Sequence, residues 1–404
     1  MSFTRARHRR TWARAAIAAL TLTATAAGGM GAAGAAAFGA GNLLVCRVGD
    51  GAAGLVNTGA AVFLDEYTPS GTLVQSIAMP TTVSGANRRL IASGTATSEC
   101  ALSLSADGRY VLLAGYDAAL GGATSLSGTT SVAVPRTIAR VDWTGNVDTT
   151  TSLTDAASGN NPRGATSTDG NQLWIVGGAG GIRSAVLGGT TSTQLSTTVT
   201  NLRQATIASG QLFVSTSSGS AVRVGTVGSG TPTTIGQTIT NLPGFPVTGS
   251  PYAFAFADLT ASVVGNDTLY VADDTPGTIQ KFSLVGSTWV ASGSIAATGV
   301  RGLTLKVSGS TVTLYGTTGG STATGGGSIY VATDASGYNV AAAGTASSIA
   351  TAATNTAMRG IVLTPQNTAP PVEIPEVPFA VLASLSALVV LGGMTAIRRR
   401  SALA

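Results

Sequence analysis

Hydrophobic residues between positions 38 and 365 occur in short runs of β-branched and aromatic side chains. Gly, Asp-Gly and Ser-Gly pairs separate these runs. Runs of this kind are typical of β-strands, and the glycine pairs are typical of the turns that join them. No part of this body has the periodicity of an amphipathic helix. The pattern predicts an all-β body.

One unit recurs along this body. It begins with an arginine-containing approach, enters a strand of small and apolar residues, turns at a polar-Gly pair and continues into a strongly apolar strand. The clearest copies are residues 161–176, 201–214 and 301–315, and copies without the arginine are residues 98–113 and 251–272. A third strand follows each copy. Repeats of this size are typical of β-propeller blades, which stack around an axis because one blade cannot cover both of its faces.

The first and last repeats are incomplete. Residues 42–48 have an outer-strand pattern without a preceding Arg-Gly strand, and residues 358–363 have an innermost-strand pattern before Pro365. We expect both to share one blade, so that strands from the two ends of the body close the ring and leave no open edge. This reading gives six blades. Seven is the alternative if residues 84–96 contain a degenerate strand, and a β-sandwich or β-helix would not explain the recurrent Arg-Gly pair.

Two segments carry a family resemblance. Residues 269–282, Leu-Tyr-Val-Ala-Asp-Asp-Thr-Pro-Gly-Thr-Ile-Gln-Lys-Phe, resemble an NHL-type propeller repeat. Residues 105–111, Ser-Ala-Asp-Gly-Arg-Tyr-Val, are similar to a YVTN-like propeller turn. The body therefore resembles bacterial surface propellers, and this resemblance implies the fold without fixing an activity.

The N-terminal residues 1–37 have the layout of a secretory signal peptide. Five arginines precede an apolar run, and a stretch of small residues ends at Ala35-Ala36-Ala37. An arginine-rich start, a short apolar run and a small-residue cleavage site are the parts of such a peptide. The Arg9-Arg10 pair leaves the general and the twin-arginine export routes both open.

The C-terminal residues have the layout of a membrane anchor. Residues 366–378 form a proline-rich linker, and residues 379–397 contain no charged side chain. That apolar run is long enough to cross a bilayer as a helix. Three arginines follow at 398–400 and are expected to stay cytoplasmic. We therefore predict one transmembrane helix within an anchor at residues 379–404, with the body outside the cell.

The linker ends in a motif that resembles a sorting signal. Pro375-Glu376-Val377-Pro378, followed by the apolar segment and arginines, resembles the tails of the PEP-CTERM class of bacterial surface proteins. The resemblance implies a sorting protease of the exosortase type as a partner. The order of residues departs from the usual Pro-Glu-Pro, so cleavage and retention of the tail both stay open.

The charge distribution argues against a nucleic-acid partner. The formal net charge is +5, but five arginines lie in residues 1–37 and three lie at 398–400, which leaves the body close to neutral. Nucleic-acid binding needs a basic stripe, and the body has only the pair Arg88-Arg89. The basic character therefore belongs to the two ends.

Histidine and cysteine set further limits. His8 is the only histidine, and it lies in the predicted signal peptide. This excludes from the body a Ser-His-Asp triad, a Cys-His pair and a histidine-bound zinc. Cys46 and Cys100 are the only cysteines. An exported chain enters an oxidising compartment, so we predict a disulfide between them, with two unrelated buried cysteines as the alternative.

Four arginines share one position in the repeat: Arg163, Arg203, Arg301 and Arg359. In a propeller they would start innermost strands and form a ring of guanidinium groups near one face. Such a ring can bind a carboxylate, a phosphate or an anionic glycan through paired hydrogen bonds. The alternative is that each arginine bonds carbonyls or acids of the neighbouring blade and holds the ring together.

Asp273 and Asp274 are weaker candidates, as oxygen ligands for calcium. Their spacing fits no known calcium loop, and a turn-forming role is favoured.

These observations predict an exported surface protein, anchored in the membrane or wall, that acts as a binding or structural module for an anionic polysaccharide. No cofactor is required for that role. The alternative is a calcium-dependent hydrolase or lactonase of the six-bladed propeller type. The lack of histidine and of a convergent acid cluster favours binding over catalysis.

Overall fold

The computed structural model describes residues 35–367. This part of the chain contains strands β1 to β26 and one short 3-10 helix, η1 (Leu126–Gly128), and it contains no α-helix. No helix within residues 35–367 is long and apolar enough to cross a membrane. Most of the predicted signal peptide, most of the linker with its Pro375–Pro378 motif, and the predicted anchor lie outside the described residues.

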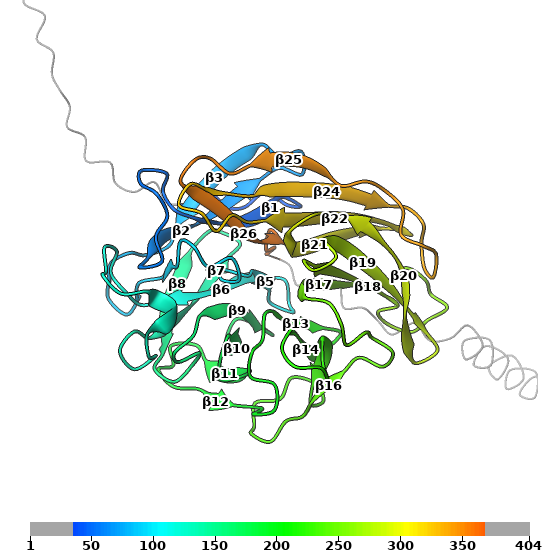
Figure 1. Ribbon diagram of the computed structural model, residues 1–404, viewed down its shortest axis with the longest axis horizontal. Coiled ribbons are helices and arrows are strands. Elements are labelled where there is room, and N and C mark those ends of the chain that lie inside the picture. Colours follow the sequence, from blue (N-terminus) through cyan, green and yellow to red (C-terminus); the bar gives the residue numbers. More distant parts are fainter. Residues whose placement is uncertain (1–34, 368–404) are drawn as a thin grey trace, which may run out of the picture. The chain divides into compact units, whose positions relative to one another are not determined.

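Four separate four-stranded antiparallel sheets follow one another along the chain. Each begins with an inner strand near the centre of the ring and continues outward, which is the arrangement of a propeller blade (Figure 1). In order from the inside outward, the four blades are β9 (Pro162–Ser167), β10 (Gln172–Gly177), β11 (Arg183–Val186) and β12 (Thr193–Gln194); β13 (Ala205–Ala208), β14 (Gln211–Ser215), β15 (Val224–Val227) and β16 (Ile239–Asn241); β17 (Pro251–Ala257), β18 (Thr268–Asp273), β19 (Thr278–Val285) and β20 (Thr288–Ala296); and β21 (Val300–Ser308), β22 (Thr311–Thr318), β24 (Ser328–Asp334) and β25 (Ser347–Thr351).

One ten-stranded sheet completes the ring. Its main path runs β23-β26-β1-β2-β4-β6-β7-β8, with β3 paired to β2 and β5 paired to β6. The ten strands are β1 (Leu43–Val48), β2 (Ala60–Tyr67), β3 (Leu73–Ala78), β4 (Ile91–Ala92), β5 (Ser103–Leu104), β6 (Tyr110–Tyr116), β7 (Arg136–Asp142), β8 (Val147–Leu153), β23 (Gly325–Gly326) and β26 (Thr356–Leu363). The described residues therefore form an all-β propeller.

The predicted count of six separate blades is wrong, and so is the alternative of seven. The structure has four four-stranded blades and the ten-stranded sheet. The physical reason is β4, a two-residue strand inside residues 84–96. It pairs with β2 through Ala60 opposite Ala92 and with β6 through Ile91 opposite Tyr116, so it joins two repeats into one sheet. The degenerate strand exists as a bridge and builds no further blade.

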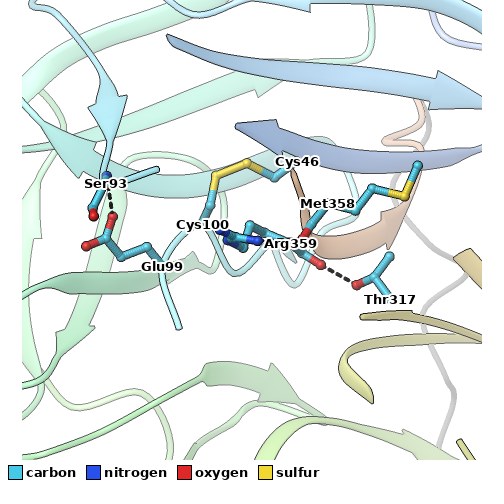
Figure 2. Close-up of a disulfide and its surroundings, with 7 residues drawn as sticks. All are labelled: Cys46, Ser93, Glu99, Cys100, Thr317, Met358 and Arg359. Carbon is cyan, nitrogen blue, oxygen red and sulfur yellow. Dashed lines mark hydrogen bonds between the residues drawn. A yellow bond between two sulfur atoms is a disulfide. The ribbon is translucent and has the colours of Figure 1, made fainter. Parts of the chain in front are cut away.

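The two ends of the described body pair with each other. Strand β1 lies antiparallel to β26, with Leu43 opposite Leu363 and Val48 opposite Ala357. A disulfide joins Cys46 of β1 to Cys100, just before β5, with the Cα atoms 6.2 Å apart (Figure 2). Closure by strands from both ends is thus present, and so is the cysteine pairing that the sequence predicts.

Each pair of neighbouring sheets shares a buried apolar core. Trp174 and Val176 of β10 pack with Leu212 and Val214 of β14. Comparable clusters join β6 and β7 to β9–β11, β15 to β17–β20, β17–β19 to β21–β24, and β1 and β26 to β22 and β24. The ring is therefore held by side-chain burial between sheets, while hydrogen bonds hold each sheet.

A close approach at the axis depends on one glycine. The backbone N–H of Gly360 in β26 donates to the carbonyl of Cys100. A Cβ atom added at Gly360 would lie 2.5 Å from that carbonyl oxygen and would also contact the backbone nitrogen of Leu102. Only glycine lets β26 and the segment before β5 come this close.

Replacing Gly360 by alanine should therefore lower the free energy of unfolding by about 1–3 kcal/mol, because the added methyl group overpacks a site bounded by backbone. Gly128→Ala is the matched control, since a Cβ there meets nothing within 4 Å. Urea denaturation of both variants measures the difference. Equal stability of the two variants would contradict the close packing at the axis.

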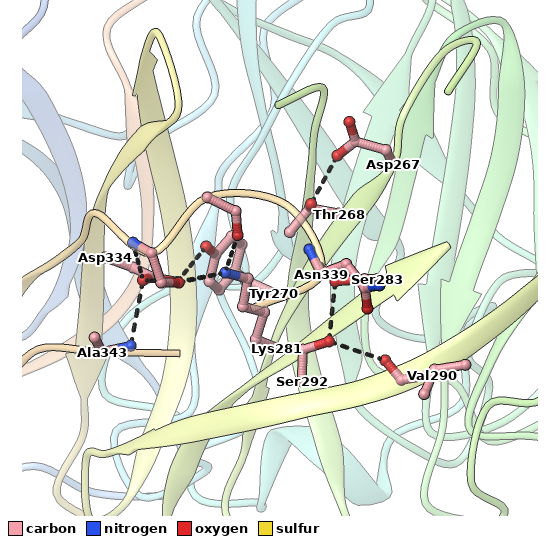
Figure 3. Close-up of polar contacts among 12 residues, drawn as sticks. Asp267, Thr268, Tyr270, Lys281, Ser283, Val290, Ser292, Asp334, Asn339 and Ala343 are labelled. Carbon is pink, nitrogen blue, oxygen red and sulfur yellow. Dashed lines mark hydrogen bonds and ion pairs between the residues drawn. The ribbon is translucent and has the colours of Figure 1, made fainter. Parts of the chain in front are cut away.

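A buried ion pair connects two blades. The Lys281 ammonium in β19 lies 2.9 Å from Asp334 Oδ2 at the end of β24, and both side chains are fully buried. The Tyr270 hydroxyl donates to the same oxygen at 2.7 Å, and Lys281 also donates to the Gly337 carbonyl (Figure 3). Each charge thus has several hydrogen-bond partners, which offsets the cost of burying it.

The same network fixes the ionisation of Asp334. Burial raises its pKa, but hydrogen bonds from Ser336, Tyr270 and Lys281 outweigh that effect and bring the pKa down to about 2. The ordinary value is 3.8. A carboxyl group with a lowered pKa stabilises the fold above its ordinary pKa, and this contribution is lost as the pH falls through about 2.

Removing the cation alone should destabilise the domain more than neutralising the pair. Lys281→Met leaves the buried Asp334 carboxylate without its counter-ion and should cost about 3–5 kcal/mol. Adding Asp334→Asn removes the uncompensated charge and should recover part of that loss. Thermal unfolding of the two variants tests this order, and a double variant less stable than Lys281→Met would contradict it.

Candidate functional site

The four repeated arginines gather at one end of the propeller axis. Arg163 lies in β9, Arg203 precedes β13, Arg301 lies in β21 and Arg359 lies in β26. Arg203, Arg301 and Arg359 line one cavity of about 20 Å³, and Arg163 is close enough to act electrostatically on Arg203. A cavity of this size holds about one water molecule. The shared repeat position thus becomes a shared place in space, and we call it the arginine end.

In the fifth repeat, Tyr252 of β17 occupies the position that holds an arginine in four of the repeats. The guanidinium carbon of Arg203 lies 3.7 Å from the centre of its ring, and that of Arg301 lies 4.6 Å from it. Stacking on an aromatic face stabilises a cation and holds its plane. Sequence reasoning missed Tyr252, although Pro251-Tyr252 in the fifth repeat matches Pro162-Arg163 in an earlier one.

Most partners of these arginines are neutral. Arg163 donates to the Asn201 side chain and the Leu202 carbonyl. Within residues 35–367, the Arg203 side chain donates hydrogen bonds only to the hydroxyl of Ser217. These bonds fix the two side chains without cancelling their charge.

Arg359 and Arg301 differ from this pair. Arg359 is 4% exposed and donates to the carbonyls of Gly94 and Met358, which fits the alternative role of holding the ring. Arg301 forms an ion pair with Asp274 at 2.8 Å and donates to the hydroxyl of Thr97. Within residues 35–367, Arg301 is the only one of the four with an acid at ion-pair distance.

Burial and neighbouring positive charges lower the pKa values of arginines at this end. Burial lowers the pKa of Arg203 to about 10, and the positive charges of Arg163 and Arg301 add to this effect against the carboxylates of Asp274 and Asp273. Burial also lowers the pKa of Arg359 to about 10. The Nε–H groups of Arg163 and Arg359 are buried and have no hydrogen-bond partner within the described residues. The arginine end is therefore an electropositive site with donor capacity to spare.

One buried carboxyl group, Glu99, lines the same cavity. The Tyr116 hydroxyl donates to one of its oxygens at 2.8 Å. The backbone N–H of Ser93 donates to the other, also at 2.8 Å (Figure 2). Burial raises the pKa of Glu99 to about 7, although these bonds and the charges of Arg359 and Arg136 act in the opposite direction. A carboxyl group that titrates near neutral pH in a cavity is a candidate for function.

Sequence reasoning missed Glu99, because nothing in its repeat distinguishes it from a surface acid. Its one signal is its place directly before Cys100, whose disulfide fixes the segment. The backbone of Cys100 has a positive φ of 61°, which is uncommon for a residue other than glycine.

The two candidate calcium ligands have other partners. Asp273 accepts hydrogen bonds from the backbone N–H groups of Ser250 and Thr275, as a turn-forming aspartate does. Asp274 pairs with Arg301. No group of three or more His, Cys, Asp or Glu residues in the described part of the chain is arranged to hold a metal ion.

Comparisons with known proteins give only distant structural likenesses. No protein-family model matches the sequence, and no curated protein matches it. A candidate 6-phosphogluconolactonase from Bacteroides fragilis has a TM-score of 0.40 at 13% identity, covering 71% of this chain and 77% of that one. The periplasmic gluconolactonase of Pseudomonas aeruginosa has a TM-score of 0.40 at 13% identity, covering 72% and 78%. A nidogen–laminin complex has a TM-score of 0.43 at 14% identity, covering 80% and 98%. At these scores the fold assignment rests on the strand topology described above.

Proposed function

We propose that the arginine end binds an anionic ligand through a carboxylate or phosphate group. The observation that carries the proposal is Arg203, which is influenced by the like charges of Arg163 and Arg301 and, among residues 35–367, has no acid at ion-pair distance. A bound anion would offset the repulsion, and guanidinium groups pair well with carboxylate and phosphate.

The size of the cavity limits how such a ligand binds. About 20 Å³ admits a single small group, so the rest of the ligand would lie across the mouth. Thr97, Ser98 and Tyr252 line the same cavity as the arginines. Hydroxyl groups beside an aromatic ring suit a sugar, and we therefore propose an acidic carbohydrate as the ligand class.

We also propose that the domain works outside the cytoplasm, anchored through residues 379–404, with an acidic surface polysaccharide as partner. The Cys46–Cys100 disulfide supports this setting, because disulfides persist in oxidising compartments.

A hydrolase that opens an anionic sugar lactone is the second candidate function. The specific observation is Glu99, a carboxyl group with a pKa of about 7 in the same cavity as the arginines. As a general base it would take a proton from water while the water oxygen attacks the lactone carbonyl carbon. The ring C–O bond would then break, and the proton on Glu99 would pass to the departing ring oxygen, giving the open hydroxy acid. This reading involves no calcium ion.

Two of the similar structures are named as gluconolactonases, and we therefore choose 6-phosphogluconolactone as the substrate to test. Hydrolysis above the spontaneous rate, rising with pH through about 7 and absent in Glu99→Gln, would establish this candidate. Binding without turnover would reject it.

Replacing Arg203 by glutamine should weaken binding of galacturonate oligomers and of glucose 6-phosphate by about 10-fold to 100-fold at low salt, since one charge-assisted contact is lost. Arg109→Gln is the control, because Arg109 is exposed, has no ion pair in the described residues and changes the net charge equally. Calorimetry measures both. Equal affinity of the two variants would show that Arg203 only supports the ring.

Affinity for a carboxylate ligand should rise as the pH falls from about 8 to about 6. Over this range Glu99, with its pKa of about 7, gains a proton and one negative charge leaves the arginine end. Galacturonate keeps its charge throughout, so the change reports the protein. Glu99→Gln should bind tightly at both pH values, and an unchanged pH dependence in this variant would assign the effect to another group.

A further inference from the structure

The opposite end of the propeller axis carries a second and larger cavity. The inner strands run from the arginine end toward it: β21 runs from Arg301 to Leu305, β26 runs from Arg359 to Leu363, and the segment that carries Arg203 continues through β13 to Ile207. The cavity measures about 1000 Å³. We call it the wide end, and the proposed anion site makes no use of it.

The lining of the wide end is mainly apolar. Its larger apolar side chains are Leu104, Ile207, Phe254, Phe256, Leu305 and Leu363. Among residues 35–367, no lysine or arginine lines it, and the two carboxyl groups that do, Asp107 and Asp258, lie in turns that follow inner strands. Asp107 accepts hydrogen bonds from Ser105 and from the Arg109 backbone, so it forms the turn itself. The wide end therefore offers nothing that attracts an anion.

Aromatic rings packed against one another make the wall of this cavity around Phe256 rigid. Phe256 lies 4.7 Å from Phe213, 5.8 Å from Trp289 and 6.0 Å from Phe254, measured between ring centres. The bottom of the cavity, which we call its floor, contains a buried hydrogen bond of 3.0 Å from the Gln204 side-chain amide to the Leu102 carbonyl. Leu102, Gln204 and Ile361 line both cavities, so this floor separates the two ends of the axis.

A preformed cavity of this size with apolar walls and a few polar groups has the properties of a small-molecule site. Contiguous apolar surface left open to water is uncommon in proteins and marks places where something binds. The two carboxyl groups in the described lining disfavour an acidic ligand, and the apolar walls disfavour a highly hydrated one. We propose that the wide end binds an uncharged, apolar small molecule, separately from the anion at the arginine end.

The neutral dye N-phenyl-1-naphthylamine tests this proposal on the full chain. Its fluorescence should rise and saturate at one site per chain. Leu305→Asp places a charge in the cavity wall and should weaken binding by at least about tenfold. Leu73→Asp is the matched control, because Leu73 lies in β3, away from the cavity, and is 53% exposed. Glucose 6-phosphate should not compete, which separates this site from the arginine end.

A second variant tests the same cavity in case Leu305→Asp does not fold. Thr206→Trp fills the same cavity from β13 without adding charge, and it should reduce dye binding by a comparable factor. Loss of binding in every folded cavity variant, with retention in Leu73→Asp, supports the proposal. Non-saturable binding by the parent chain, or unchanged binding in the folded cavity variants, would overturn it.

Discussion

The backbone pairing of β1 with β26 is the contact on which the rest of this structure depends. A propeller buries its blade faces only when every sheet has a neighbour on both sides, and this pairing supplies the last one. It also sets the position of Gly360, whose N–H bonds the Cys100 carbonyl. The disulfide from Cys46 to Cys100 then ties the closing strand to the segment that carries Glu99.

Closure gives the axis two ends with different chemistry. Inner strands that all run in one direction place their first residues at one end and their last residues at the other. The first residues are charged or aromatic, as with Arg301 and Tyr252, and the last are apolar, as with Leu305. The floor formed by Gln204 and Leu102 keeps the two environments apart. The two ends of one axis therefore differ in charge and polarity and are separated at the middle.

Much of the fold could be predicted from the sequence, because turn residues and apolar runs are local signals. The pairing of residues 42–48 with 358–363 followed from the incomplete first and last repeats. The blade count failed at β4, since two residues that bridge two repeats leave no pattern to detect.

Of the candidate site, only the residues that recur at one position of the sequence repeat could be predicted. The four arginines share a position and so could be found, whereas Glu99 and Tyr252 occur once each. Their roles depend on burial and on neighbours far away in the chain, such as Tyr116 for Glu99 and Arg203 for Tyr252. A single sequence carries no direct record of such contacts.

The position of β26 has a consequence for how the domain comes into being. This strand is the last of the described body to be synthesised, yet it pairs with the first and lies at the centre. Contacts between residues so far apart in the chain form slowly, because a long loop must close before they yield any stabilisation. Arg359 and Gly360 both lie on that strand, so its pairing with β1 completes the ring and the arginine end at the same time. A nascent chain that has not yet reached residue 360 therefore lacks part of the arginine end, and the candidate site is complete only when the last strand has paired.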